Sequence, residues 1–480
     1  MKWPGHTVCE IIIVEYIKNM NPDNVHKTSL SILEEIGIPV DSERCLKIYD
    51  SIGCKIDHQK KKVWFREDII NNALSAAKGS HRVYNREGSS CKIFGDGNLL
   101  FTSGACAIKK RISNGNYKET SLKDLENFTI LHDHLGSIDI IHTAVDANDV
   151  DQNRLRTAMA GVVFKNTDKP CWFLASHPRV AEKIFRMGIT IRGSEDDLRK
   201  KPFFRIACAP NSVLGFSKDE IETLLRCSEL GIPTDCEHDP IMGLTAPLSV
   251  TAALAINNAN FLCALVLKKH IDPDNPSIFP ILAGSTNMKS GEIITSSPEI
   301  WEYYIAGIEM ADYYGLPSSV LVSSESKDLD MQLSFEKAIG TFISANAGAN
   351  NIFDATGAMD SMNMASLEDA LIENEFISAI KKFLDVKVNK GKENDLELIK
   401  RGLKNKMYFL DDVHTINNFK EFLWDSGLLI KENFDRWFNF KDRTFEERAK
   451  KQVKKITDTH VPTKLPNKVI KDIDKIVEEA

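Results

Sequence analysis

Polar and charged residues gather at the ends of short apolar runs along this sequence. Glu237, His238 and Asp239 end one such run, and Phe353 and Asp354 end another. A carboxylate beside a histidine is a usual acid–base pair, and an aromatic ring beside a carboxylate suits a cationic ligand. We take Glu237, His238 and Glu325 as candidate catalytic residues. The candidate substrate-binding residues are Ser103, His142, Ser176, Gly284, Ser285, Ser323, Ser324, Phe353 and Asp354.

These residues lie in a regular alternation of strand-like and helical patterns. The eight apolar runs cover residues 99–103, 138–144, 171–176, 203–209, 232–237, 278–283, 319–323 and 350–355, and each precedes a helical pattern. Eight such pairs predict an α/β fold of the (β/α)8 TIM-barrel type, in which the carboxyl ends of the strands carry the active site. A doubly wound open sheet is the alternative, but no GxGxxG motif follows any run.

The barrel pattern occupies the middle of a 480-residue chain. Residues 1–95 predict an N-terminal α+β layer, with a helix at 25–37 and another at 66–77. Residues 96–385 form the predicted barrel. Residues 386–480 predict a mostly helical C-terminal extension that is rich in aromatic residues. The apolar run at 251–267 contains three asparagines, which favours a buried core helix over a membrane span.

Composition and cysteine spacing exclude several classes of function. The net charge is −7 with both signs interspersed, so we expect neither a nucleic-acid partner nor a membrane partner. None of the ten cysteines forms a CxxC pair, which argues against a zinc cluster and favours a reducing, cytoplasmic location. His132-Asp133-His134 has the spacing of a metal-binding pair, but it ends a helical pattern. We therefore predict no metal site.

Several segments resemble the trimethylamine methyltransferase superfamily in order and spacing, from Val25 to about Trp437. The segments are Ser31-Ile32-Leu33-Glu34-Glu35-Ile36-Gly37, Leu244-Thr245-Ala246-Pro247, Gly284-Ser285-Thr286, Tyr314-Gly315-Leu316-Pro317, Val413-His414-Thr415 and Phe422-Leu423-Trp424. The resemblance implies a (β/α)8 barrel that moves a methyl group from an amine to Co(I) of a corrinoid (cobalamin). It also implies that a separate corrinoid protein carries this group and docks over the barrel mouth.

The founding members of this family carry pyrrolysine in the loop that corresponds to residues 323–327, where this sequence has only standard residues. Pyrrolysine-free relatives demethylate quaternary amines of the betaine type, such as glycine betaine and carnitine. The resemblance therefore implies a quaternary amine substrate and no cofactor bound by the chain itself. We also expect a homo-oligomer. Phe353 stands where many relatives have His or Tyr, which leaves the identity of the amine open.

The chemistry of the leaving group supports the same expectation. A quaternary ammonium leaves as a neutral tertiary amine, so attack by Co(I) requires no general acid and no Lewis acid. A methanol or thioether donor requires activation, commonly by zinc. The enzyme then contributes mainly orientation and desolvation.

Two other hypotheses fit the residues. A barrel hydrolase or lyase could use Glu237 and His238 without a corrinoid partner. A non-catalytic protein could bind a betaine without turnover.

Overall fold

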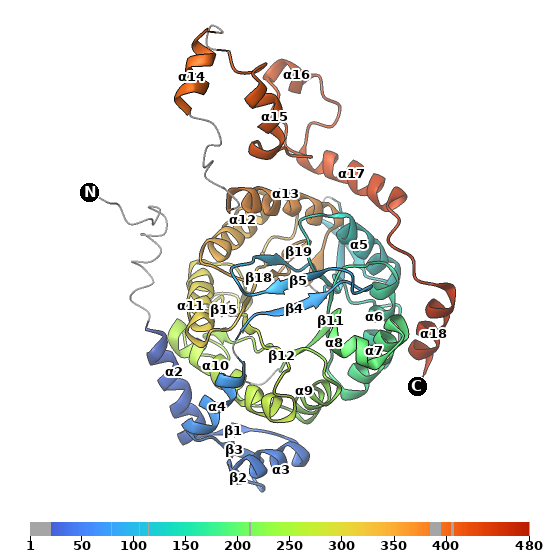
Figure 1. The fold of residues 1–480 in the computed structure, drawn as a ribbon. Coiled ribbons are helices and arrows are strands. Elements are labelled where there is room, and N and C mark those ends of the chain that lie inside the picture. The colour runs from blue at the N-terminus through green and yellow to red at the C-terminus, as the bar shows by residue number, and fades with distance from the viewer. Residues whose placement is uncertain are drawn as a thin grey trace, which may run out of the picture.

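The amino-terminal part of the chain is a small α+β layer. The computed structural model describes residues 21–77, 79–104, 106–113, 115–210, 213–384, 395–404 and 408–479 (Figure 1). The helices of the layer are α2 (Pro22–Ser31), its π-helical continuation η1 (Ile32–Ile36), α3 (Glu43–Ile52) and α4 (Glu67–Ala77). They surround an antiparallel sheet in the order β1 (Ile38–Pro39), β3 (Lys62–Trp64), β2 (Lys55–Asp57).

Each of the eight predicted βα pairs is present in the structure. The strands are β6 (Leu100–Phe101), β9 (Ile141–His142), β10 (Cys171–Leu174), β11 (Phe204–Cys208), β12 (Thr234–Cys236), β14 (Phe279–Ile281), β17 (Ser318–Leu321) and β18 (Asn351–Phe353). The helices are α5 (Leu122–His134), α6 (Leu155–Lys165), α7 (Pro178–Arg192), α9 (Lys218–Leu230), α10 (Val250–Ile271), α11 (Pro298–Tyr314), α12 (Met331–Asn346) and α13 (Leu367–Leu384). A short helix, α8 (Glu195–Lys200), precedes β11.

The eight strands form two parallel four-stranded sheets inside the ring of helices seen in Figure 1. Their orders are β12–β11–β10–β9 and β14–β17–β18–β6. A parallel bridge between Thr102 and Ile140 joins β6 to β9. On the opposite side, the continuations β13 (Ile241–Met242) and β15 (Gly284–Thr286) pair with each other, whereas the described residues of β12 and β14 form no ladder. The fold is therefore a mixed α/β fold, without a single closed eight-stranded sheet over the described residues.

Three short antiparallel pairs extend the strands at their carboxyl side. The hairpin of β7 (Lys109–Ser113) and β8 (Asn116–Glu119) follows β6, and β15 pairs with β16 (Ile293–Ile294) after β14. After β18, β19 (Ala358–Met359) pairs with β20 (Met364–Ala365), which also pairs with β7. These additions place loops around the end of the sheets where the sequence predicts the functional residues.

The opposite end of the strands is covered by the hairpin of β4 (His81–Tyr84) and β5 (Cys91–Phe94), which crosses the centre of the ring in Figure 1. Val83 and Phe94 of this hairpin are buried in one apolar cluster with Leu100, Ile140 and Trp172 of the strands. Burial of these apolar side chains fixes the hairpin in place. The amino-terminal end of the sheets is thus covered by packed side chains.

Helix α10 is a buried core helix, as the asparagines in its sequence predicted. Among the described helices it alone is long and apolar enough to cross a membrane, and 83% of its most apolar window is buried inside the protein. Asn257 donates to the carbonyl of Pro280 at 3.1 Å, and Asn258 donates to Ser29 at 2.9 Å. These hydrogen bonds tie the helix to β14 and to the amino-terminal layer.

The carboxyl-terminal elements divide into an arm and two packed helices. Helices α17 (Phe445–Thr459) and α18 (Asn467–Glu478) lie against the ring, α17 on α13 and α5, and α18 on α6 and α7. Helices α14 (Asp395–Lys404), α15 (Val413–Phe422) and α16 (Phe434–Phe438) project from it (Figure 1). This projecting arm exposes large apolar side chains, among them Leu403, Tyr408, Leu410, Val413, Ile416, Leu423, Phe434 and Phe438.

Candidate functional site

His142 ends β9 and lies at the carboxyl end of the strands. Its main-chain N–H donates to Ser103 Oγ at 3.2 Å, which ties the end of β9 to the end of β6. Gly104 has φ +92°, and a Cβ there would lie 2.9 Å from the carbonyl oxygen of His142, so this close passage requires glycine. Imidazole Nδ1 lies 3.8 Å from Asp354 Oδ1, and Nε2 lies 3.9 Å from Cys106 Sγ. Burial lowers the pKa of His142, which favours the neutral ring.

Two aromatic rings and an arginine stack between the strands. The guanidinium carbon of Arg205 lies 4.3 Å from the ring centre of Trp172. Trp172 is in turn stacked on Phe353, with ring centres 5.9 Å apart and planes 15° apart. One face of Phe353 is therefore turned to Trp172, and the same ring packs with the apolar side chains of Leu282 and Leu321. Phe353 is the last residue of β18, so the stack places an aromatic ring at the carboxyl end of the strands.

Two carboxyl groups, those of Glu237 and Asp354, lie close to these rings and His142. Glu237 accepts a hydrogen bond from Trp172, and burial raises the pKa of Glu237 to about 7. Burial also raises the pKa of Asp354 to about 8. Asp239 follows Glu237 by two residues; burial raises its pKa to about 7, and its charge acts on Tyr303 and Tyr304 of α11. We call His142, Trp172, Glu237, Phe353 and Asp354 the strand-end cluster. Such shifted carboxyls are typical of sites that receive a ligand charge.

Asp354 is held in an unusual backbone conformation by a buried lysine. Its φ is +53°, a region that side-chain-bearing residues rarely adopt. Lys337 Nζ donates to the carbonyl oxygen of Asp354 at 2.7 Å and to that of Val322 at 3.1 Å. The same Nζ lies 3.2 Å from Glu373 Oε1, and both of these charged side chains are buried. Lys337 thus positions Asp354 and does not itself end in the cluster.

The segment 323–327 behaves differently from the prediction for Glu325. The carboxylate of Glu325 accepts from Thr295 N at 2.5 Å, from Thr295 Oγ1 at 2.8 Å and from Ser361. Lys327 pairs with Asp360 at 3.1 Å. These hydrogen bonds join three loops through the Glu325 side chain. Its carboxylate oxygens are therefore already occupied.

The remaining predicted residues divide between buried and peripheral positions. Ser323 is fully buried and its hydroxyl has no hydrogen-bond partner, whereas Ser324 donates to Glu336 at 2.6 Å. Ser285 donates to Glu299 at 2.9 Å, and Gly284 lies beside it in β15. Ser176 is exposed in the loop before α7, and His238 is buried next to Glu237. The structure therefore brings His142, Glu237, Phe353 and Asp354 together, but leaves Ser176 at the surface.

The His132-Asp133-His134 segment makes structural contacts at the end of α5. His132 is buried with Nε2 3.1 Å from Thr356 Oγ1, and Asp133 lies 2.7 Å from Nε2 of His460. His134 packs its ring edge-on against the same His460. Across the described ranges, no three His, Cys, Asp or Glu side chains are grouped as metal ligands.

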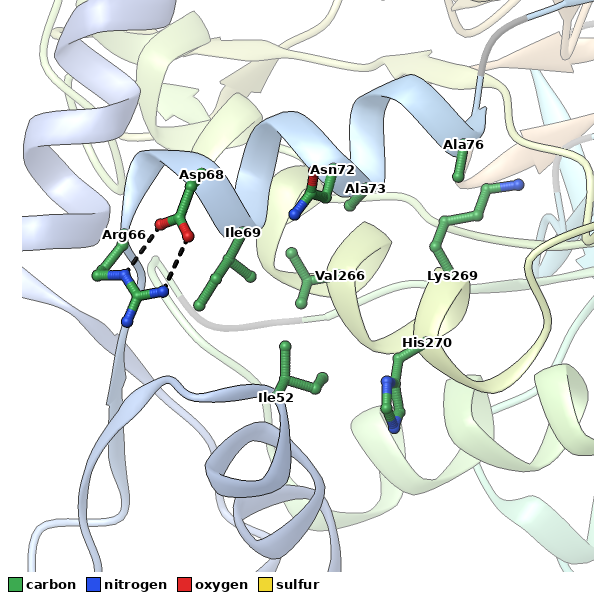
Figure 2. Close-up of a pocket in the computed structure, with 10 residues that line it drawn as sticks. All are labelled: Ile52, Arg66, Asp68, Ile69, Asn72, Ala73, Ala76, Val266, Lys269 and His270. Carbon is green, nitrogen blue, oxygen red and sulfur yellow. Dashed lines mark hydrogen bonds and ion pairs between the residues drawn. The ribbon is translucent and has the colours of Figure 1, made fainter.

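A separate cavity of about 250 Å³ lies between α4 and the end of α10 (Figure 2). Helix α10 precedes β14, so its last residues lie at the amino-terminal end of the strands, away from the strand-end cluster. Two of the charged groups that line this cavity are already committed: Arg66 pairs with Asp68 at 2.8 Å, and Lys269 donates to the carbonyl of Asn275 at 2.6 Å. We do not assign the candidate site to this cavity.

Sequence reasoning missed Trp172, although a signal for it was present. Side chains alternate between the two faces of a strand. In β10, Trp172 lies on the inner face, while Cys171 and Phe173 belong to the core between strands and helices. The sequence analysis also missed Cys106. No local sequence pattern predicts its φ of +51° or its contact with His142.

Comparison with known proteins shows the family of the chain. The sequence model of the family "Trimethylamine methyltransferase (MTTB)" matches residues 5–479. Trimethylamine methyltransferase MttB of Desulfitobacterium hafniense is 25% identical over 459 residues, covering 95% of this chain and 92% of the relative. Glycine betaine methyltransferase of Desulfitobacterium hafniense strain Y51 is 25% identical over 453 residues, covering 92% of each.

A solved structure has a similar fold. The crystal structure of the hydroxylamine MtmB complex is similar with a TM-score of 0.50 at 11% sequence identity, covering 92% of this chain and 93% of that one. The family match extends over nearly the whole chain, through every strand that contributes to the strand-end cluster. The chain belongs to the trimethylamine methyltransferase family and is a methyltransferase.

Proposed function

We propose that this methyltransferase moves a methyl group from a quaternary amine to the Co(I) of a corrinoid that a separate protein carries. We further propose that the chain binds no metal or organic cofactor of its own, and that its two parallel sheets serve as a (β/α)8 barrel. The observation that carries the proposal is the strand-end cluster. Its stacked rings suit the methyl groups of the amine, and its buried carboxyls suit the positive charge.

The reaction requires little chemistry from the side chains. Co(I) supplies an electron pair to the methyl carbon, and the carbon–nitrogen bond breaks with its pair on nitrogen. The products are a neutral tertiary amine and a methylated Co(III). No proton moves, so Glu237 and His142 hold and orient the cation in this proposal. Burial removes water from the charged donor, which is the setting in which orientation is most effective.

The segment 323–327 supports a donor that is already quaternary. Its side chains are hydroxyls, a carboxylate and an amine, and none is an electrophile that could convert trimethylamine into a quaternary adduct. The oxygens of Glu325 are hydrogen-bonded to neighbouring loops. The family match also favours a methyltransferase over the hydrolase, lyase and binding-protein hypotheses.

The test uses the purified chain with free cob(I)alamin and a panel of quaternary amines. Formation of methyl-Co(III), followed by its absorption spectrum, is the expected result for at least one amine. Stoichiometric zinc in the purified protein, with activity lost on chelation, contradicts the proposal. A matched reaction with Glu237→Gln should be at least about tenfold slower, since a desolvated charge contact is lost.

We also propose that the chain forms a homo-oligomer in the cytoplasm and that the projecting arm contacts a second copy. A second apolar surface lies on α12 and α13, where Met331, Phe335 and Phe383 are exposed. An arm that reaches this surface of another copy would cover both apolar patches, which are larger than single scattered residues. Light scattering should report an oligomer for the native chain and smaller species for Leu410→Asp with Phe434→Asp. A monomeric native chain contradicts this arrangement.

A further inference from the structure

The strand-end cluster has more carboxyl groups than cations to balance them. Glu237 and Asp354 contribute two carboxyls. Oδ1 of Asp354 is buried without a hydrogen-bond partner, and its side chain has a relative exposure of 4%. Burial favours the neutral form of this carboxyl, and its ionised form requires a cation beside it, so this oxygen points to a ligand that supplies a positive charge.

The cations near the cluster already have carboxylates of their own. Arg156 lies 2.6 Å from Asp146. Arg205 pairs with Asp235 below Trp172, and Lys337 pairs with Glu373. Arg205 and Lys337 still favour the charged forms of Glu237 and Asp354, but burial outweighs this effect at both groups. Of the described arginines and lysines around the cluster, these three therefore offer no free charge to an anion.

Resting on the proposed function, we infer that the methyl donor is a quaternary ammonium ion without a carboxylate, such as tetramethylammonium or choline. A betaine is a zwitterion, and in glycine betaine a single methylene separates the ammonium from the carboxylate. Both of its charges would therefore have to lie within the strand-end cluster. The ammonium would be attracted, but the carboxylate of the betaine would face Glu237 and Asp354 with no free cation to pair with.

This inference departs from the betaine-type donor that the family resemblance implies. The inferred donor and a betaine differ in one property: a betaine has an acidic group close to the nitrogen, and the inferred donor has none. Choline and glycine betaine have the same trimethylammonium head and differ in the hydroxymethyl or carboxylate group beside it. The two compounds are therefore a matched pair for the test.

The first experiment measures binding to the chain without any corrinoid. Isothermal titration calorimetry with tetramethylammonium, choline and glycine betaine at the same pH should show the plain cations binding at least about tenfold more tightly. Glycine betaine binding as tightly as choline, or more tightly, overturns the inference. The same three compounds are then tried with free cob(I)alamin. Absence of methyl-Co(III) from every quaternary amine contradicts the proposed function itself, which is a separate outcome.

The second experiment changes the charge of the cluster. Asp354→Asn removes the carboxylate with the unpartnered oxygen, so the preference for choline over glycine betaine should fall at least about tenfold. The control is Glu309→Gln on α11, which removes a carboxylate with a buried, unpartnered oxygen from a helix outside the cluster. The control should leave the preference unchanged. An unchanged preference in Asp354→Asn, or an equal change in the control, contradicts the inference. The comparison of ligands on the native chain tests the inference even where a variant does not fold.

Discussion

Binding of a quaternary ammonium ion should strengthen as the pH rises. The pKa of Glu237 is raised to about 7 by burial, so below that pH the carboxyl is mostly neutral in the free protein. A cation is attracted to the ionised form alone, so binding is lost as the pH falls through this value. For a site that requires a protonated carboxyl, binding would instead weaken as the pH rises.

The size of the effect follows from the fraction of Glu237 that is ionised. Between about pH 6 and about pH 8, that fraction rises from about one tenth to about nine tenths. The apparent affinity should therefore rise about tenfold, or about 1.4 kcal/mol, from this group alone. The pKa of Asp354 is raised to about 8, so its ionisation adds to the effect. Because these carboxyls interact, the measured values belong to the group as a whole.

Calorimetric titration with tetramethylammonium over this pH range measures the effect without a corrinoid. Tetramethylammonium has no titrating group, so any pH dependence belongs to the protein. Glu237→Gln should bind more weakly at about pH 8 and show a shallower pH dependence, because one titrating group is gone. A native affinity that changes less than about twofold refutes the reasoning. An equally steep dependence in Glu237→Gln refutes the role of this residue.

Four further predictions follow from described contacts. Phe353→Ala should weaken tetramethylammonium binding about tenfold or more by calorimetry, since an aromatic face is lost; an unchanged affinity removes the ring from the site. Lys337→Met should lower the free energy of unfolding in urea by about 3–5 kcal/mol, because Glu373 is left buried without its cation; a loss below about 1 kcal/mol contradicts the buried pair. Gly104→Ala should lower thermal stability, because the new Cβ meets His142; an unchanged melting temperature contradicts the close approach. Trimethylamine should give no methyl-Co(III) signal where a quaternary amine does, and comparable turnover contradicts the interpretation of segment 323–327.

Much of the fold could be predicted because local signals mark the ends of its elements. Helix α9 begins with a capping box formed by Ser217 and Glu220 and ends at Gly231 in the left-handed conformation, and the sequence pattern over 218–230 predicts the same bounds. Helix α11 begins at Pro298 and ends before Gly315, and the pattern over 298–314 predicts it equally well. Helix α3 and the β15–β16 pair were missed. Two-residue strands such as β16 are too short to show any periodicity.

The candidate site was predictable only where a residue follows directly after a strand. Glu237 and Asp354 follow β12 and β18, so the barrel pattern located them. The contact partners could not be found in this way. Glu325 is hydrogen-bonded to Thr295 and Ser361, which are 30 and 36 positions away in the sequence. Only the folded arrangement of the loops shows that its oxygens are occupied.

The hairpin of β4 and β5 has a consequence for the order of events in the proposed reaction. Val83 and Phe94 fill the amino-terminal end of the strands, so ligands reach the strand-end cluster from the carboxyl side. A corrinoid protein that delivers Co(I) must approach from that same side. The amine should therefore bind first, and the tertiary amine should leave only after the corrinoid protein has separated. Steady-state kinetics should be ordered and sequential, and excess corrinoid protein should inhibit by blocking the empty enzyme.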